Sequence, residues 1–218
     1  MSQRNSRSPL ESVPEPRPSD GRRARGMRSR TAILDLSVQM ASREGLEGLT
    51  IGELAGNLGV PKSSVFALFG SKEELQLATL AEARRILIGQ VVRPAAPAAE
   101  GIERLRALGD AWCDYLTSEV FAGGCFLCAA SAEMDGRPGP LRDAVATVMG
   151  EWLAILTMNI DAAVRSGEFD AGLDSAAMAF RLNALGMAAN WQYQLFGDEG
   201  GVAHARAAWR TEITKARP

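Results

Sequence analysis

Apolar residues recur three and four positions apart along most of the chain between about Met27 and Ala216. This spacing is typical of amphipathic helices, and abundant alanine and leucine with few β-branched runs favours the same structure. Glycine-rich or proline-rich segments interrupt the periodic stretches. The pattern predicts an all-α protein of about nine helices with short connections.

The most informative stretch runs from Thr50 to Leu75. Thr50 and Glu53 form a Thr-x-x-Glu capping box, which starts a helix. Gly59 stands where that helix ends with positive φ. We expect Val60, the next residue, to tuck its side chain back between two helices.

A second short helix is predicted over Lys62–Phe69. Pro61 lacks a backbone N–H and is therefore tolerated at the start of this helix, and Gly70 ends it. Ser71 and Glu74 form another capping box, which opens a long third helix. This order of elements is the helix-turn-helix motif, whose second helix enters the major groove of DNA.

An earlier helix is predicted from about Met27 to Glu44, and Gly45 ends it. Its apolar stripe is expected to cover the helix-turn-helix. The three helices share a small predicted core, which consists of Ile33, Leu36, Met40, Leu49, Leu54, Leu58, Val65 and Phe69.

Beyond this head the pattern predicts a helical bundle. A long helix runs from Lys72 to about Val92, and the Pro/Ala-rich segment Arg93–Glu100 is the clearest internal boundary. Five amphipathic segments follow, at Gly101–Glu119, Cys125–Met134, Pro140–Ser166, Asp174–Phe196 and Glu199–Ala216. Several long helices with short connections are typical of a bundle.

Charge is distributed unevenly, although the net charge is only −2. Residues 1–30 contain eight Arg and three acidic residues, whereas the chain from Gln76 onward contains 13 basic and 17 acidic residues. Positive charge therefore lies at the end that carries the helix-turn-helix, where phosphate contacts require it. The composition of residues 1–26 predicts that they form a disordered basic tail. That tail is either simply solvated or an arm whose arginines reach phosphates or the minor groove.

The composition also bears on the cellular environment. Three cysteines give no disulfide framework and suit a reducing compartment. No apolar run approaches the roughly 18 residues that span a bilayer, and the N-terminus has no hydrophobic signal region. We therefore expect a cytoplasmic protein with no membrane segment.

The helix-turn-helix stretch resembles the DNA-binding domain of the TetR-type transcriptional repressors. The positions that fill the family signature, in order and without a gap, are Thr50, Leu54, Ala55, Gly59, Val60, Ser64, Val65, Phe66, Phe69, Ser71, Lys72 and Leu75. Three positions depart from it. Phe66 stands where the family usually has a phosphate-contacting Tyr, Leu68 replaces a polar His or Tyr, and Pro61 replaces a capping Ser. These departures concern the DNA contacts rather than the fold.

The resemblance implies a regulator rather than an enzyme. Residues 27–75 would form the helix-turn-helix DNA-binding domain, and residues 76–218 the ligand-binding and dimerisation domain. By the same resemblance, Asp174–Phe196 and Glu199–Ala216 pair with their counterparts in a second subunit. The homodimer would bind a palindromic double-stranded DNA operator, and a small effector in the bundle would release it.

The outward face of the Lys62–Phe69 helix is the candidate groove-reading surface. Serine hydroxyls can bond to base edges, and small apolar side chains can pack on a thymine methyl group. The candidate DNA-binding residues, including those suited to phosphates, are Arg28, Thr50, Lys62, Ser63, Ser64, Phe66, Ala67, Leu68 and Lys72. The alternatives are plain packing for Ala67 and Leu68 and plain capping for Thr50. Phe66 is also expected to share the inward side with Val65 and Phe69.

Large, adaptable apolar residues are abundant in the bundle, and an apolar cavity between bundle helices is a common small-molecule site. The candidate ligand-binding residues are Trp112, Tyr115, Phe126, Met149, Trp152, Asn183, Met187, Asn190 and Trp191. An apolar or aromatic effector is therefore expected, with core packing as the alternative for each residue.

Cys125 and Cys128 form a C-x-x-C sequence at a predicted helix start, where a thiol pKa can fall. A redox-sensing repressor is thus an alternative, and two plain core cysteines are another. No cofactor or metal is expected, since His204, the only histidine, lies far along the chain from the cysteines. The remaining alternatives are a helical enzyme or a ligand-independent DNA-binding protein. The sequence has no nucleophile elbow, phosphate loop or dinucleotide fingerprint.

Overall fold

The computed structural model describes residues 18–118 and 120–218, with side chains from residue 26 onward. These residues form ten α-helices and one π-helical segment, and they contain no strand, which confirms the all-α prediction. The elements are α1 (Pro18–Gly48), α2 (Ile51–Leu58), α3 (Lys62–Phe69), α4 (Lys72–Leu87), η1 (Ile88–Val92), α5 (Arg93–Ala95), α6 (Ile102–Thr117), α7 (Phe126–Met134), α8 (Pro140–Arg165), α9 (Ser175–Phe196) and α10 (Gly200–Lys215).

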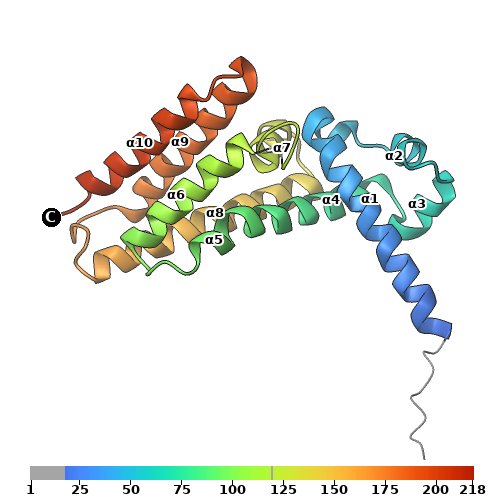
Figure 1. Ribbon diagram of the computed structural model, residues 1–218, viewed down its shortest axis with the longest axis horizontal. Coiled ribbons are helices and arrows are strands. Elements are labelled where there is room, and N and C mark those ends of the chain that lie inside the picture. The colour runs from blue at the N-terminus through green and yellow to red at the C-terminus, as the bar shows by residue number, and fades with distance from the viewer. Residues whose placement is uncertain (1–17, 119) are drawn as a thin grey trace, which may run out of the picture.

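The elements form a small head and a larger bundle. In Figure 1 the head, made of α1, α2 and α3, lies at one end of the molecule, and α4 runs from it along the bundle beside α8. α9 and α10 form an antiparallel hairpin on the opposite side of the bundle, with α6 between the hairpin and α4. α4 and α7 are the bundle helices that also contact the head.

The local start and stop signals of the head act as predicted. The Thr50 side chain accepts a hydrogen bond from the Glu53 N–H at 3.2 Å, and the Ser71 side chain accepts one from the Glu74 N–H at 3.1 Å. Gly59, with φ of 64°, ends α2 in the left-handed conformation. Because these signals are local, α3 has the predicted bounds.

Three local predictions need correction. α1 begins at Pro18 rather than near Met27, so residues 18–26 of the predicted tail are helical, and residues 1–17 lie outside the described residues. Val60 is 37% exposed rather than tucked between the helices, although its N–H donates to the Ala55 carbonyl at 3.0 Å and so completes the end of α2. The fourth helix continues past Val92 as α5, and the chain breaks only after Ala95.

Two hydrophobic cores form. The head core contains most of the predicted residues, but Leu36 and Leu58 are only half-buried, and Leu34 and Leu75 are buried in addition. The bundle core surrounds Trp112, which approaches α9 at Gly186. A Cβ on Gly186 would lie 2.1 Å from the Trp112 ring, so only glycine permits this contact. None of the helices in the described part of the chain is long and apolar enough to cross a membrane.

Candidate DNA-binding surface and effector cavity

The outer face of α3 carries an exposed aromatic side chain. Val65 and Phe69 are buried in the head core, as predicted. Phe66 was expected beside them, but 57% of its surface is exposed. It follows Val65 directly, and one residue turns an α-helix by about 100°, which moves its ring away from the core. Phe66 therefore shares the outer face with Lys62, Ser63, Ser64 and Ala67, which are all exposed.

Two other candidates on the head are partly committed elsewhere. Leu68 is half-buried and packs against the head core. Lys72 donates from Nζ to the Glu47 carbonyl at 2.6 Å and lies 3.4 Å from the Glu47 carboxylate. Lys62 differs, because it makes no ion pair among the described residues. Its Nζ lies against α2 at Gly52, where the Cβ of any larger residue would be only 3.0 Å away from it.

The first turn of α3 can receive an anion. α3 has no side-chain cap among the described residues. The Ser64 N–H donates to the Pro61 carbonyl at 2.9 Å, so the Lys62 and Ser63 N–H groups are the ones of the first turn that are open to an external acceptor. Thr50, which is exposed, caps α2 with its hydroxyl. Capping does not prevent the same hydroxyl from donating to a phosphate.

An additional basic residue lies beside this surface. The Arg30 guanidinium lies 5.2 Å from the centre of the Phe69 ring, over its face, which orients a cation next to α3. Arg28 is exposed on α1. No local sequence pattern pairs Arg30 with Phe69, because the contact joins two helices.

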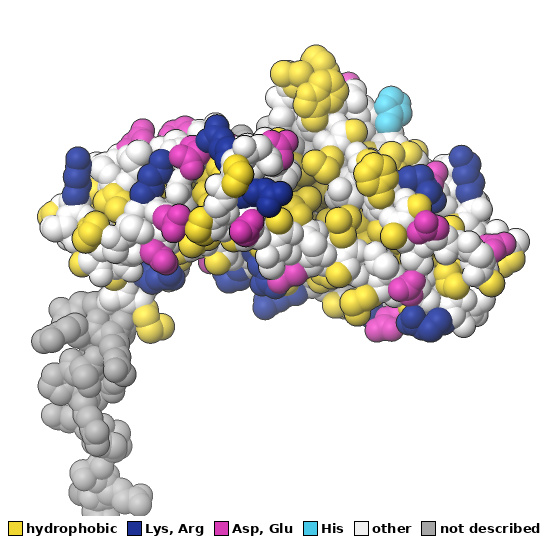
Figure 2. All heavy atoms as spheres, turned by 180° about the vertical axis from the view of Figure 1, so that it is seen from behind, with side chains coloured by type: hydrophobic (Ala, Val, Ile, Leu, Met, Phe, Trp, Pro, Cys, Tyr) yellow, Lys and Arg dark blue, Asp and Glu magenta, His cyan; other side chains and the backbone are white. Residues whose placement is uncertain are grey.

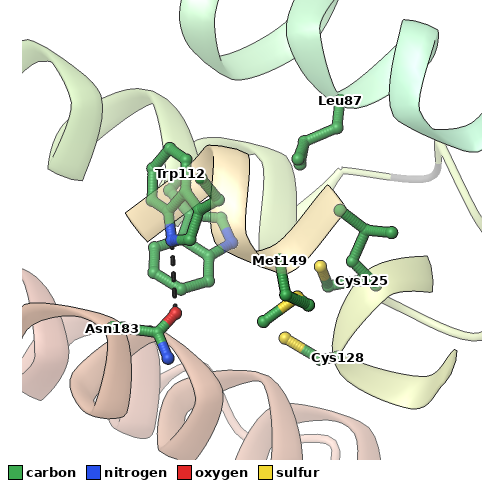
Figure 3. A pocket seen from close by; sticks show the side chains of 8 residues that line it. Leu87, Trp112, Cys125, Cys128, Met149 and Asn183 are labelled. Atoms are coloured by element: carbon green, nitrogen blue, oxygen red, sulfur yellow. Dashed lines mark hydrogen bonds between the residues drawn. The ribbon is translucent and has the colours of Figure 1, made fainter. Parts of the chain in front are cut away.

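The bundle contains a narrow apolar cavity. Side chains from five helices line it, namely Leu87, Trp112, Cys125, Leu127, Cys128, Met149, Trp152 and Asn183. Figure 3 shows Trp112, Met149 and Asn183 around the same space as the two cysteines. The free volume is about 10 Å³, which is room for about one water molecule. Four predicted ligand-binding residues thus meet here, Trp112, Met149, Trp152 and Asn183.

The two indoles in the cavity wall differ in their hydrogen bonding. Trp112 and Trp152 pack edge to face, with ring centres 5.0 Å apart. Trp152 Nε1 donates to the Asn183 side-chain oxygen at 3.2 Å, which is the dashed line in Figure 3. Trp112 Nε1 is buried and has no hydrogen-bond partner among the described residues. An unpaired buried donor costs about 1–3 kcal/mol, so an acceptor that reached this N–H would be stabilising.

The other predicted ligand-binding residues lie outside this cavity. Met187, Asn190 and Trp191 line an open groove between α7 and α9, which has a free volume of about 410 Å³ and shares Cys128 with the cavity. Asn190 also has a structural role, since its side-chain oxygen accepts a hydrogen bond from the Cys125 N–H at 2.8 Å. Phe126 is buried against Phe121. The sequence named these residues as candidates for one ligand-binding site, because it did not distinguish the two sides of α7.

Tyr115 is likewise buried beneath the cavity rather than in its wall. Burial raises the pKa of its phenol, which is therefore neutral. The hydroxyl has no partner of ordinary hydrogen-bond geometry among the described residues, although it lies near the Cys125 thiol.

The C-x-x-C sequence lies at the start of α7, with both thiols at the cavity. A hydrogen bond from the Cys128 thiol, aided by the N–H groups of Leu127 and Cys128, lowers the pKa of Cys125 to about 7. The same hydrogen bond and burial raise the pKa of Cys128. Burial also raises the pKa of Cys113, which is not part of the cavity wall. The three thiols therefore differ in nucleophilic character.

Among the residues that the structure describes, no group of three or more His, Cys, Asp or Glu side chains could hold a metal ion. α4 and α7 connect the head and the apolar cavity, because both contact the head and both line the cavity.

Two family models match the chain. Residues 33–79 match the model described as bacterial regulatory proteins, tetR family. Residues 101–209 match the model described as tetracyclin repressor-like, C-terminal domain. A comparison with curated protein sequences gave no match.

Solved structures share the fold at low sequence identity. A TetR transcriptional regulator from Chloroflexus aurantiacus is 21% identical, with a TM-score of 0.82 over 88% of this chain and 97% of that one. NemR from Escherichia coli in its reduced form is 21% identical, with a TM-score of 0.70 over 84% and 95%. AibR in complex with isovaleryl coenzyme A and operator DNA is 19% identical, with a TM-score of 0.65 over 83% and 96%. Since the two family models together cover the head and most of the bundle, the chain belongs to the TetR family of bacterial transcriptional regulators.

Proposed function

We propose that this protein is a repressor that binds a palindromic operator as a homodimer and releases it when a small effector enters the bundle. The observation that carries the proposal is the continuous connection between an exposed recognition helix and an apolar cavity. α4 lines the cavity with Leu87 and packs its other end, at Leu75, into the head core. A ligand that prefers a different α4 position need supply only about 1–3 kcal/mol of coupling.

The outer face of α3 combines two kinds of DNA contact. Lys62 and the open N-terminal turn suit phosphates, which fix position without reading sequence. Phe66 and Ala67 present apolar surface that suits thymine methyl groups in the major groove. Phe66 lacks the hydroxyl of the usual family tyrosine, so we assign it to base contact rather than to phosphate contact.

The two kinds of contact predict different salt behaviour. In Lys62→Gln, operator affinity falls, and the slope of log K against log salt falls by about 0.9 for each lost phosphate contact. In Phe66→Ala, affinity falls by about 1–3 kcal/mol with an unchanged slope. Salt-titrated binding to a duplex selected from a random pool measures both. Lys215→Gln at the exposed end of α10 is the control. An unchanged slope in Lys62→Gln would remove this lysine from the interface.

The dimer proposal depends on the exposed side of α9. A stripe along this helix consists of exposed, mostly apolar residues spaced three or four apart, namely Ala176, Phe180, Ala184, Ala188, Trp191 and Leu195. Phe180 is 70% exposed and Trp191 59%. Figure 2 shows hydrophobic side chains gathered at the turn between α9 and α10. A helix pair with small residues at its centre and large ones at its ends suits a four-helix interface with a second copy.

A charge at the centre of the stripe tests this interface. We expect Ala184→Glu to give monomers, because the two-fold axis brings two buried carboxylates together, and an unpaired buried charge costs several kcal/mol. Ala146→Glu, at an exposed position of α8, is the matched control and keeps the dimer. Sedimentation equilibrium measures the mass. A monomeric wild type, or a dimeric Ala184→Glu, would contradict the proposed interface.

The effector must widen the cavity before it can bind. An open groove between α4 and α8, with a free volume of about 310 Å³, shares Leu87 and Trp152 with the cavity, so these two side chains are the ones that must move to admit a molecule from this side. The walls favour apolar or aromatic molecules, and the unpaired Trp112 N–H favours those with a hydrogen-bond acceptor. The fold relative AibR, which binds isovaleryl coenzyme A and operator DNA, supports a small-molecule role for this bundle.

Matched ligands test the role of Trp112. We expect acetophenone to bind more tightly than ethylbenzene by about 1–3 kcal/mol, because its carbonyl pairs the free N–H. The preference is lost in Trp112→Phe. It persists in Trp209→Phe, whose indole N–H donates to the Leu105 carbonyl at 2.9 Å in the wild type. Isothermal titration measures the affinities. Equal affinities in the wild type, or a preference that survives in Trp112→Phe, would contradict this assignment.

A redox response is a second candidate, favoured by the two thiols that face one cavity. Hydrogen peroxide is close to water in size and fits the space. The Cys125 thiolate attacks it to give a sulfenic acid and hydroxide, and the Cys128 thiol then displaces water to form a disulfide. The fold relative NemR was solved in a form described as reduced.

Peroxide titration tests this candidate. We expect loss of two thiols and of operator binding, both restored by dithiothreitol, with a rate that rises as the pH passes about 7, where Cys125 ionises. Cys125→Ser and Cys128→Ser abolish the response, whereas Cys113→Ser retains it. Thiol assay and binding after oxidation give the readouts. Oxidised protein that binds the operator as reduced protein does would refute the redox candidate.

A further inference from the structure

The connection between α1 and α2 contains a break in the helix, and the backbone N–H groups at this break need hydrogen-bond acceptors. Gly45, with φ of 80° and ψ of 165°, interrupts α1, and a short turn over Leu46–Gly48 follows. The first N–H groups of a new helical turn have no partner within that turn. The N–H groups of Leu46 and Glu47 therefore need acceptors from water or from another part of the molecule.

Glu133, at the end of α7 in the bundle, supplies both acceptors. Its Oε2 accepts from the Leu46 N–H at 2.8 Å, and its Oε1 accepts from the Glu47 N–H at 2.9 Å. A Cβ on Gly45 would lie 2.7 Å from Oε1, so the glycine also makes room for the carboxylate. A charged acceptor of two N–H groups is a strong cap, because both bonds are charge-assisted.

The carbonyls of the same two residues are held from the opposite side by α4. Gln76 Nε2 donates to the Leu46 carbonyl at 2.7 Å, and this contact is buried. Lys72 Nζ donates to the Glu47 carbonyl at 2.6 Å. The Leu46–Glu47 segment is therefore bonded to α7 through its N–H groups and to α4 through its carbonyls.

Both helices that hold this segment also line the cavity. α4 contributes Leu87 to the cavity wall, and α7 contributes Cys125, Leu127 and Cys128. A molecule too large for the present 10 Å³ must move helices of the cavity wall, and we expect it to change the separation of α4 and α7, two of the five helices that line it. Because Leu46 and Glu47 are bonded to both helices, they cannot remain fully bonded when that separation changes.

We propose that Glu133 is a positioning residue, which fixes the α1–α2 connection and through it the orientation of α2 and α3. It gives the cavity a second route to the DNA-binding surface, through α7, in addition to α4. This inference rests on the proposed effector response, and it deepens it by naming the contact that responds.

The first test needs neither effector nor DNA. Amide hydrogen exchange at Leu46 and Glu47 should be at least tenfold faster in Glu133→Ala than in the wild type. Glu133→Gln keeps an acceptor oxygen without the charge, so its exchange rates fall between the two. Asp135→Ala, an exposed acidic position two residues away, is the matched control and leaves both rates unchanged. Unchanged exchange in Glu133→Ala would overturn the proposal.

The second test measures coupling to DNA. Met149→Phe places a larger side chain in the cavity and serves as a fixed substitute for an effector. We expect it to weaken operator binding at least tenfold in the wild-type background and at most threefold in the Glu133→Ala background. The same tenfold weakening in both backgrounds would reduce Glu133 to a local cap and overturn the proposal.

The two tests separate this inference from the proposed function. If Met149→Phe leaves wild-type affinity unchanged, the effector proposal fails. In that case Glu133 is judged by Glu133→Ala alone, which must accelerate exchange at Leu46 and Glu47 and lower operator affinity at least fivefold relative to Asp135→Ala. Faster exchange with unchanged affinity would overturn the positioning role.

Discussion

The structure depends on one helix that belongs to two hydrophobic cores. The first turn of α4 buries Leu75 in the head core, whereas Leu80 and Leu87 are buried in the bundle core. A three-helix head of this size buries too little apolar surface to be very stable by itself. It therefore depends on α4, and any change in the direction of this helix is shared by both parts of the molecule.

A buried polar contact fixes how α4 meets α1. The Thr79 hydroxyl donates to the Ser37 hydroxyl at 3.0 Å, and both side chains are fully buried. Each hydroxyl also has a carbonyl partner on its own helix, Leu34 for Ser37 at 3.0 Å and Leu75 for Thr79 at 2.7 Å, so this buried polar cluster is paired where the two helices meet. Further along α1, Gln39 donates to the Val120 carbonyl at 2.7 Å, which attaches the head to the loop before α7. The head is thus held at several defined points.

The sequence was sufficient to predict features that short segments determine. The caps at Thr50 and Ser71 and the left-handed Gly59 are specified by neighbouring residues, so the bounds of α3 followed from them. The head core followed from helical periodicity. The orientation of Phe66 did not, because an apolar residue on a short helix is compatible with either face. The pairs Arg30–Phe69 and Lys72–Glu47 join different helices, so no spacing along the chain predicts these contacts.

The candidate cavity was predicted in part for the same reason. Trp112, Met149, Trp152 and Asn183 were named from their residue types and do meet in one wall. Trp191 was named for its type as well, but it is exposed on α9. A pattern of large apolar residues is the same for a core, a cavity wall and a surface that another subunit can cover. Glu133 carried no signal beyond its charge, because its two partners are far away in the sequence.

The π-helical segment η1 gives α4 mechanical properties that a uniform helix would lack. Helices bend with least cost at such widened turns, where the backbone bonding is already irregular. η1 lies just beyond the cavity wall at Leu87, while Val91 and Ala95 are almost fully buried and anchor its far end. A bend at this turn would therefore displace the segment toward the head, while the buried Val91 and Ala95 hold the other end in place.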